Sequence, residues 1–298
     1  MKHAIVDIGS NTIRMVMYRV FNGKIEYLLN SKINGRLADY IEDGEMRIDG
    51  AKVIIDSINK HKALASHHNL DNINYFATAP LRVSNVEDVL AAVREGTGAD
   101  IDVLSGETEA RCGVDGIAYD FDISNCICFD LGGGSMEISL VKDGSIKESI
   151  SLHIGSVSMT RNFVSGILPT ADEIAGIRER TLEALKEVEW LCCDKLDVAY
   201  AVGGSARAMA KMHQIFNNSQ QDLHGYRLFG VNIHKIYDQL LDMGIEGIKL
   251  IDQHCGGRLF TIVPGMVIID TVMQYTHIPV LRFSQFGVRE GYLLNYVI

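Results

Sequence analysis

The sequence of 298 residues lacks several features that mark other classes of protein. Its apolar start, residues 1–20, is interrupted by Asp7, Asn11 and Arg14 and is therefore too short for a signal h-region or a membrane span. We expect a cytoplasmic protein with no membrane partner.

Basic residues are also few. There are 28 Lys and Arg against 38 Asp and Glu, a net charge of −10. This charge repels polyanions at long range and excludes a general nucleic-acid binder. A phosphate ligand would have to be held by local basic groups or by metal ions.

Metal-binding cysteine and histidine patterns are missing. No two CxxC elements have zinc spacing, and the ten histidines form no HExxH or HxH motif. The thiols are expected to be reduced and mostly buried. The six cysteines are Cys112, Cys126, Cys128, Cys192, Cys193 and Cys255.

With only four prolines and no low-complexity stretch, the chain has no recognisable linker. Its length favours two domains, and 47% apolar residues are ample for their cores. We therefore place the boundary in an ordered connection near residues 119–124. This gives an N-terminal phosphate-binding α/β domain (1–120) and a C-terminal α/β domain (121–298), with the last helix packing back on the first domain and the ligand site in the cleft between the domains.

What the sequence does contain is an internal duplication. DIGSN at Asp7 and DLGGGS at Asp130 each end one apolar strand, begin another, and are followed by a hairpin turn at Gly23 or Gly144. The expected strands are 2–8, 13–20 and 25–29 in the first copy and 126–131, 136–141 and 145–152 in the second.

Helices and strands alternate between the copies, and this βαβα order predicts a mostly parallel sheet. The second half is more helical. Between the copies we expect helices 51–67, 86–94 and 107–118 and strands 73–77 and 101–104. After them we expect strand 197–202 and helices 157–164, 171–191, 205–213, 233–241, 263–275 and 288–296.

The two glycine turns are candidate phosphate sites, because backbone N–H groups in such turns can meet phosphate oxygens. An ordinary strand turn is the alternative, which duplication at matching positions disfavours. The side chains and glycines of these turns that we expect at the phosphate are Ser10, Asn11, Thr12, Gly132, Gly133, Gly134 and Ser135.

Carboxylates near the turns suggest a cation site. Glu137 follows Asp130 across the turn, and we expect Asp7, Asp130 and Glu137 to bind Mg²⁺ or Mn²⁺ through oxygen ligands. An exposed strand glutamate is the alternative for Glu137.

A third glycine turn, in AVGGSARAM, offers N–H donors from Gly203, Gly204 and Ser205 at a helix start, with Arg207 nearby. Close helix packing is the alternative there.

Three such turns in this order resemble the ribonuclease H-like domains of the actin, sugar kinase and chaperone superfamily. Seven blocks resemble one family in it, the exopolyphosphatase and guanosine pentaphosphate phosphatase (Ppx/GppA) family. They are DIGSNTIR, ATAPLR, SGETEAR, DLGGGSMEIS, HIGSVSMT, AVGGSARAMAK and SQFGVREGYL, spanning residues 4–293. Because longer members carry a further histidine-aspartate domain, the chain resembles the short, two-domain type.

This resemblance implies hydrolysis of a terminal phosphoanhydride of polyphosphate or guanosine pentaphosphate, assisted by Mg²⁺. Glu109 in SGETEAR would be the general base, and Arg82 in ATAPLR would contact phosphate. Read without the family, Glu109 could be a helix-dipole carboxylate and Arg82 a surface loop residue. Arg289 and Glu290 read as a local structural pair.

Three departures from the family pattern stand out. Thr108 precedes Glu109 where a second glutamate is usual, which changes the acidity around the base. Ser158 replaces a basic residue, and the residues after Arg82 are one position short before Asn85. Fewer cations favour a short or nucleotide-linked substrate over long polyphosphate.

Two other functions stay open, a catalytically weak sensor of guanosine tetra- and pentaphosphate and an ATP-dependent kinase of the same superfamily. The sequence leaves the oligomeric state open, with a homodimer as one alternative.

Overall fold

The duplicated strand pattern forms part of two separate sheets. The computed structural model describes residues 1–192 and 195–298. The chain divides into a first unit, Met1–Glu109 with Asn295–Ile298, and a second unit, Ala110–Leu294. The division into functional domains at 1–120 and 121–298 stays a prediction.

The first unit is built on a five-stranded sheet in the order β3-β2-β1-β6-β7. Its strands are β1 (Lys2–Ile8), β2 (Ile13–Phe21), β3 (Lys24–Ile33), β6 (Asn72–Ala77) and β7 (Ile101–Val103). The hairpin strands β1, β2 and β3 pair antiparallel, whereas β1, β6 and β7 pair parallel. The short strands β4 (Ile41–Glu42) and β5 (Glu45–Met46) form a separate hairpin.

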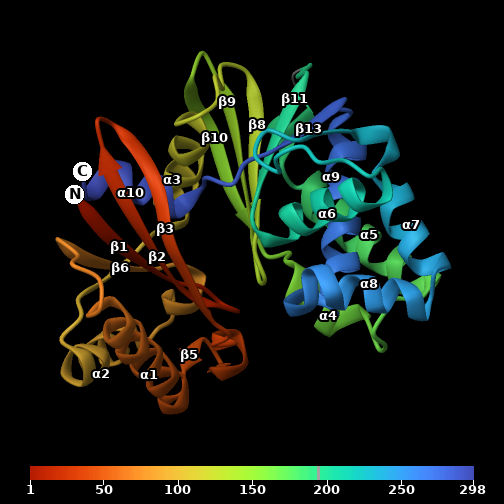
Figure 1. The fold of residues 1–298 in the computed structure, drawn as a ribbon. Helices are drawn as coiled ribbons and strands as arrows, with labels where there is room; N and C mark the ends of the chain where they lie inside the picture. Colours follow the sequence, from red (N-terminus) through yellow and green to blue (C-terminus); the bar gives the residue numbers. More distant parts are fainter. Residues whose placement is uncertain (193–194) are drawn as a thin grey trace. The chain divides into compact units, whose positions relative to one another are not determined.

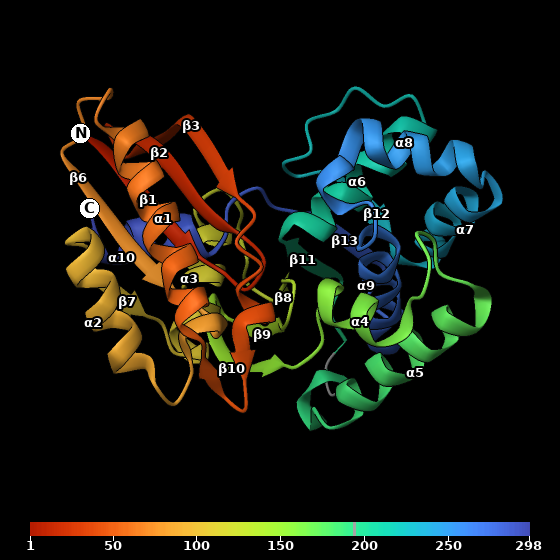
Figure 2. The same cartoon turned by 90° about the horizontal axis from the view of Figure 1, so that it is seen from below.

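Helices α1 (Ile48–Ala65) and α2 (Val86–Thr97) lie side by side against this sheet (Figure 2). Alternate residues of β1, such as Val6 and Ile8, pack in one core cluster with Ile54 and Ile58 of α1. Helix α2 ends where Gly98 adopts φ 68° and its N–H bonds the Arg94 carbonyl, a left-handed cap. Helices α1 and α2 thus form a layer that covers one face of the sheet in the first unit.

The second unit is built on a six-stranded sheet in the order β10-β9-β8-β11-β13-β12. Figure 1 labels the first five of these strands. Its strands are β8 (Cys126–Leu131), β9 (Met136–Lys142), β10 (Ser145–Leu152), β11 (Val198–Val202), β12 (Arg227–Phe229) and β13 (Val280–Phe283). Its helices are α3 (Gly106–Ala118, from Ala110 on), α4 (Ser156–Phe163), α5 (Ala171–Lys186), α6 (Gly204–Phe216), α7 (His234–Asp242), α8 (Ile245–Cys255), α9 (Ile262–Thr276) and most of α10 (Val288–Tyr296).

Strand β8 is buried on both faces, as the alternation of its side chains shows. Ile127 and Phe129 join the core with α5, α6 and α9, whereas Cys126 and Cys128 join a smaller core with Val114 and Ile117 of α3. A sheet covered on both faces is typical of α/β proteins.

Helix α9 forms much of the larger core. All residues from Ile262 to Met273 are buried, including Asp270. In the part of the chain that the structure describes, no single helix is long and apolar enough to cross a membrane. One bent pair, Ile245–Arg258 with Ile262–Thr276, passes that test by length and composition only.

The α/β class is confirmed, but both sheets are mixed rather than mostly parallel, because each duplicated hairpin adds antiparallel strands. Of the expected free thiols, Cys112, Cys126 and Cys128 are buried and Cys255 is half-buried. Cys193 and the side chain of Cys192 lie outside the described residues.

Candidate functional site

The first glycine turn joins β1 to β2 immediately after Asp7. The Gly9 N–H donates to the Thr12 carbonyl oxygen at 3.0 Å. The carbonyl groups of Ser10 and Asn11 accept bonds from the 36–38 segment, at 3.1 Å each. Hydrogen bonds within the turn and from the 36–38 segment therefore hold its conformation.

The second turn has the same construction. The Gly132 N–H donates to the Ser135 carbonyl oxygen at 2.9 Å, at the same offsets from Asp130 as Gly9 and Thr12 have from Asp7. Both hairpins that follow turn through two residues with positive φ, Asn22-Gly23 and Asp143-Gly144, as type I′ turns require. The structure confirms the duplication.

The N-terminus of α4 holds the second turn. The N–H groups of Val157 and Ser158 donate to the Gly133 carbonyl oxygen at 2.8 and 3.0 Å, and that of Ser156 donates to Gly132. A Cβ on Gly155 would lie 2.3 Å from the Gly133 oxygen, so only glycine permits this approach. Because trans peptides point N–H opposite to C=O, the N–H groups of Gly133 and Gly134 point away from α4.

Asp130 and Glu137 are direct cross-strand partners on β8 and β9. Glu137 is only 6% exposed, and its Oε1 accepts hydrogen bonds from the hydroxyls of Ser135 and Ser151 at 2.8 Å each. These bonds hold the carboxylate beside the turn. Side chains on directly opposed residues of such a pair are neighbours.

The fit of these residues to a divalent cation is mixed. Among the described residues no group of three or more His, Cys, Asp or Glu side chains is placed to hold a metal. Asp130 and Glu137 alone suit Mg²⁺, which is commonly bound by one or two carboxylates together with substrate phosphates and water. Asp7, the third expected ligand, belongs to the first unit.

The third turn leads from β11 into α6 and lies against Asp130. Val202 pairs with Asp130 in the parallel register. Gly203 has φ 97°, and a Cβ there would lie 2.5 Å from Asp130 Oδ1. The turn therefore requires glycine both for its backbone and for the carboxylate beside it.

Arg258 covers the start of α6, which the sequence did not predict. Its Nη1 donates to the Ser205 hydroxyl at 3.2 Å, and a Cβ on Gly204 would lie 1.7 Å from Nη2. A guanidinium thus sits directly on the Gly203-Gly204-Ser205 turn. The partner residues are 53 positions apart, and GGR at 256–258 is too short a signal to connect them.

In the first unit, the expected base and the expected phosphate arginine are partners. Arg82 donates from Nη2 to Glu109 Oε2 and from Nε to the Leu104 carbonyl oxygen at 2.9 Å. Glu109 is 8% exposed and lies in the first turn of α3, where its N–H bonds the Ser105 carbonyl. The Ser105 hydroxyl accepts the Thr108 N–H at 3.1 Å and so caps this helix.

The chain is similar to known proteins over nearly its whole length. The model of the Ppx/GppA phosphatase family matches residues 16–297. The chain belongs to this family. The expectation drawn from the seven sequence blocks is thereby confirmed.

The relatives of this chain include proteins named exopolyphosphatase and proteins named guanosine-5'-triphosphate,3'-diphosphate pyrophosphatase. "Exopolyphosphatase 1" of Mycobacterium tuberculosis is 26% identical over 99% of this chain and 88% of its own length. "Guanosine-5'-triphosphate,3'-diphosphate pyrophosphatase" of Vibrio parahaemolyticus is 23% identical, over 99% of this chain but 59% of its own length. The Aquifex aeolicus family member has a crystal structure that is 26% identical with a TM-score of 0.82, covering 100% of this chain and 97% of the other.

Within this Ppx/GppA fold the expected residues fall into two groups. Asp7, Ser10, Asn11, Thr12, Arg82 and Glu109 lie in the first unit, and Asp130, Gly132, Gly133, Gly134, Ser135, Glu137, Gly203, Gly204 and Ser205 lie in the second. The second group is brought together around Asp130. Glu290, which we assigned no catalytic role, is fully buried and accepts the Gly287 N–H at 2.8 Å at the start of α10.

Proposed function

We propose that this protein is a Mg²⁺-dependent phosphohydrolase that releases orthophosphate from the end of a phosphate chain. The observation that carries this proposal is Glu109, a nearly buried carboxylate held by Arg82 at the start of a helix. A carboxylate so fixed can take a proton from an attacking water, and the arginine beside it can meet the charge on the transferred phosphoryl group.

Each group has a role in the proposed reaction. The glycine turns after Asp7 and Asp130 bind phosphate oxygens through backbone N–H groups, and Arg258 adds a cation at the third turn. Glu109 orients the water and takes its proton while the water oxygen bonds to the terminal phosphorus. The P–O bond to the bridging oxygen breaks, orthophosphate is released, and the shortened chain leaves with the bridging oxygen at its new end. Attack in line with the leaving oxygen requires only positioning and charge compensation from the protein.

Asp130 and Glu137 would hold Mg²⁺ (or Mn²⁺), and a part for Asp7, which lies in the first unit, stays a prediction. When bound, the cation would withdraw charge from the phosphate oxygens. The protein would need this cation because its net charge is −10 and the described site has few basic side chains to offset the charge of the phosphates.

The substrate classes that we propose are inorganic polyphosphate and guanosine pentaphosphate. Both kinds of relative match the chain over nearly its full length. They share a terminal phosphoanhydride, which is the bond that the proposed chemistry breaks. A cytoplasmic location and a homodimer stay proposals.

The test is a phosphate-release assay with long polyphosphate, tripolyphosphate and guanosine pentaphosphate, with and without Mg²⁺. Glu109→Gln should lower the rate at least ~100-fold. Glu107→Gln, an exposed glutamate in the same helical turn, should leave it near normal. Binding of guanosine pentaphosphate without phosphate release would favour the sensor, and transfer from ATP to an acceptor would favour the kinase.

A further inference from the structure

A pocket of about 790 Å³ lies in the second unit between α5, α7 and α9. A volume of this size is typical of small-molecule sites. None of its lining residues belongs to the candidate phosphate site. They are Leu168, Pro169, Ala171, Ile174 and Arg178 from α5 and the segment before it, His234, Tyr237, Asp238 and Leu241 from α7, and Gln274 from α9.

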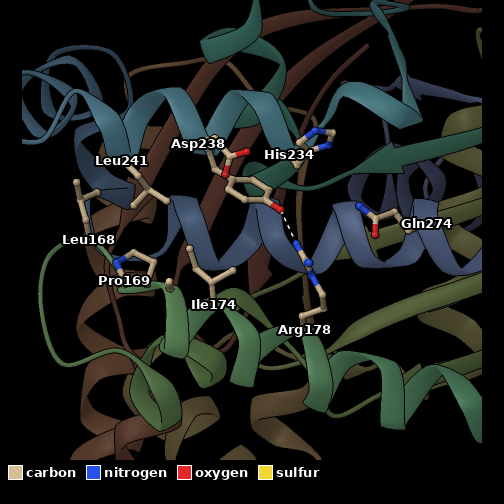
Figure 3. Close-up of a pocket in the computed structure, with 10 residues that line it drawn as sticks. Leu168, Pro169, Ile174, Arg178, His234, Asp238, Leu241 and Gln274 are labelled. Carbon is tan, nitrogen blue, oxygen red and sulfur yellow. Dashed lines mark hydrogen bonds between the residues drawn. The ribbon is translucent and has the colours of Figure 1, made fainter.

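The pocket has an apolar end and a polar end. Figure 3 shows Leu168, Pro169, Ile174 and Leu241 grouped at one end and Arg178, His234 and Gln274 toward the other. On α5, Ala171, Ile174 and Arg178 follow each other at three and four residues, so that one helical face supplies both ends. A ligand that fills the pocket must therefore be amphipathic.

Arg178 is held in place at the polar end. Its Nη2 donates to the Tyr237 hydroxyl at 2.9 Å and lies 3.7 Å from Asp270 Oδ2. The Tyr237 hydroxyl in turn donates to Asp270 Oδ2 at 2.8 Å. Asp270 is fully buried, whereas the Arg178 side chain is 40% exposed. Tyr237 and Asp270 thus hold the guanidinium in place while part of the side chain stays exposed to a ligand. Because the side chain is already ordered, it loses less conformational entropy when a ligand binds.

The charges around the pocket disfavour a ligand with several negative charges. Asp238 lines the wall and Asp270 lies beneath, bound by the Gln274 side-chain amide at 2.9 Å. These two carboxylates oppose a second or third negative charge and so disfavour phosphate chains. A carboxylate with an apolar body can accept a charge-assisted hydrogen bond from the Arg178 guanidinium and bury its body against the leucine end.

We propose that this pocket binds a small organic monocarboxylate whose apolar body lies on Leu168, Ile174 and Leu241 and whose head group meets Arg178. Such a site goes beyond the phosphohydrolase function and shares no residue with it. It offers the protein a means to bind a ligand that is not a substrate.

Titration calorimetry with octanoate, octanol and octylamine tests the proposal. Octanoate should bind about tenfold or more tightly than the other two, because a charge-assisted hydrogen bond is at stake. Arg178→Gln should remove this preference, and Leu168→Ser should weaken octanoate binding severalfold by loss of apolar contact. Arg180→Gln is the matched control, since Arg180 lies on the same helix, pairs with Glu183 and does not line the pocket.

Absence of octanoate binding, equal affinity for the three compounds, or binding unchanged in both pocket variants would overturn the proposal. If Arg178→Gln does not fold, because it leaves Asp270 buried without its cation, Leu168→Ser decides the matter together with the comparison of head groups. Leu168 lies outside the helices, where substitution leaves the network around Asp270 intact.

Discussion

The guanidinium of Arg82 donates to two acceptors, the carboxylate of Glu109 and the carbonyl oxygen of Leu104. The second bond fixes the arginine to the end of β7, and the first then fixes the carboxylate. A phosphate oxygen that approaches Arg82 competes with Glu109 for the same donors. Substrate binding would therefore free the carboxylate for the attacking water.

The coupling between these two residues can be measured by a double-mutant cycle. We expect Arg82→Gln and Glu109→Gln each to lower kcat/KM by ~100-fold or more. The loss of kcat/KM in the double variant should be much smaller than the product of the two single-variant losses, because each residue acts through the other. Additive losses would contradict the proposed coupling.

Gly203 should be intolerant of a side chain. Alanine there is strained at φ 97° and its Cβ would displace Asp130. We expect a loss of about 1–3 kcal/mol in the free energy of unfolding from the backbone alone, together with a marked loss of phosphate release. Gly98→Ala is the control, since Gly98 has φ 68° and open space around it. That variant should lose about 1–2 kcal/mol and keep its activity. Urea unfolding and the phosphate assay measure both effects.

His61 should make the first unit sensitive to acid. It is 1% exposed, neither ring nitrogen has a hydrogen-bond partner among the described residues, and burial lowers its pKa to about 4 from 6.5. The unfolded chain therefore takes up a proton as pH falls through 6.5, while the folded protein does not until about 4. The contribution of neutral His61 to the free energy of unfolding is therefore fully present above pH 6.5 and is lost as the pH falls from 6.5 toward 4.

The size of this effect follows from the shift in pKa. Between pH 7.5 and pH 4, the free energy of unfolding of the wild type should fall by up to roughly 3 kcal/mol more than that of His61→Leu. His67→Leu, at an exposed position of the same region, should behave as wild type. Equal acid sensitivity of wild type and His61→Leu in urea unfolding would show that this histidine is not responsible.

Binding of the cation can be tested at Asp130 and Glu137. Asp130→Asn and Glu137→Gln should each raise the Mg²⁺ concentration for half-maximal activity ~10-fold or more. Glu148→Gln, an exposed glutamate on β10, should not change it. Direct Mn²⁺ binding by calorimetry separates loss of the cation from loss of folding. Activity that survives a strong chelator would refute the metal requirement.

Most of the fold was predictable because its elements carry strong local patterns. The strands at 2–8 and 126–131 end at a glycine turn and alternate or run apolar, so their bounds were predicted to the residue. Strands β4, β5, β12 and β13 and helix α8 were missed. β13 has only four residues, and α8 contains Gly247, which packs against the Leu240 carbonyl. The helix expected over 171–191 ends at Lys186.

The site was less predictable where it depends on distant contacts. The glycine turns could be found because they recur at equal spacing from Asp7 and Asp130. The bond between Arg82 and Glu109 joins residues 27 positions apart, and no local pattern announces it. Arg258 was missed for the same reason. Its partner Ser205 was identified as a candidate, but the arginine itself lies in a 3₁₀ helix of three residues, Gly256–Arg258.

Arg258 should contribute more to substrate binding than to the chemical step. Its guanidinium bonds Ser205 and covers Gly204 at the helix start where phosphate is expected to bind. Arg258→Gln should therefore raise KM for a phosphate chain ~10-fold or more, as the loss of one charge-assisted contact implies, while kcat changes less. Arg227→Gln, an exposed arginine on β12, changes the net charge equally and should leave KM near wild type. At higher ionic strength the difference in KM between Arg258→Gln and the wild type should become smaller, because salt screens the attraction between the guanidinium and phosphate. A loss of kcat without a change in KM would instead place Arg258 at the reacting phosphorus.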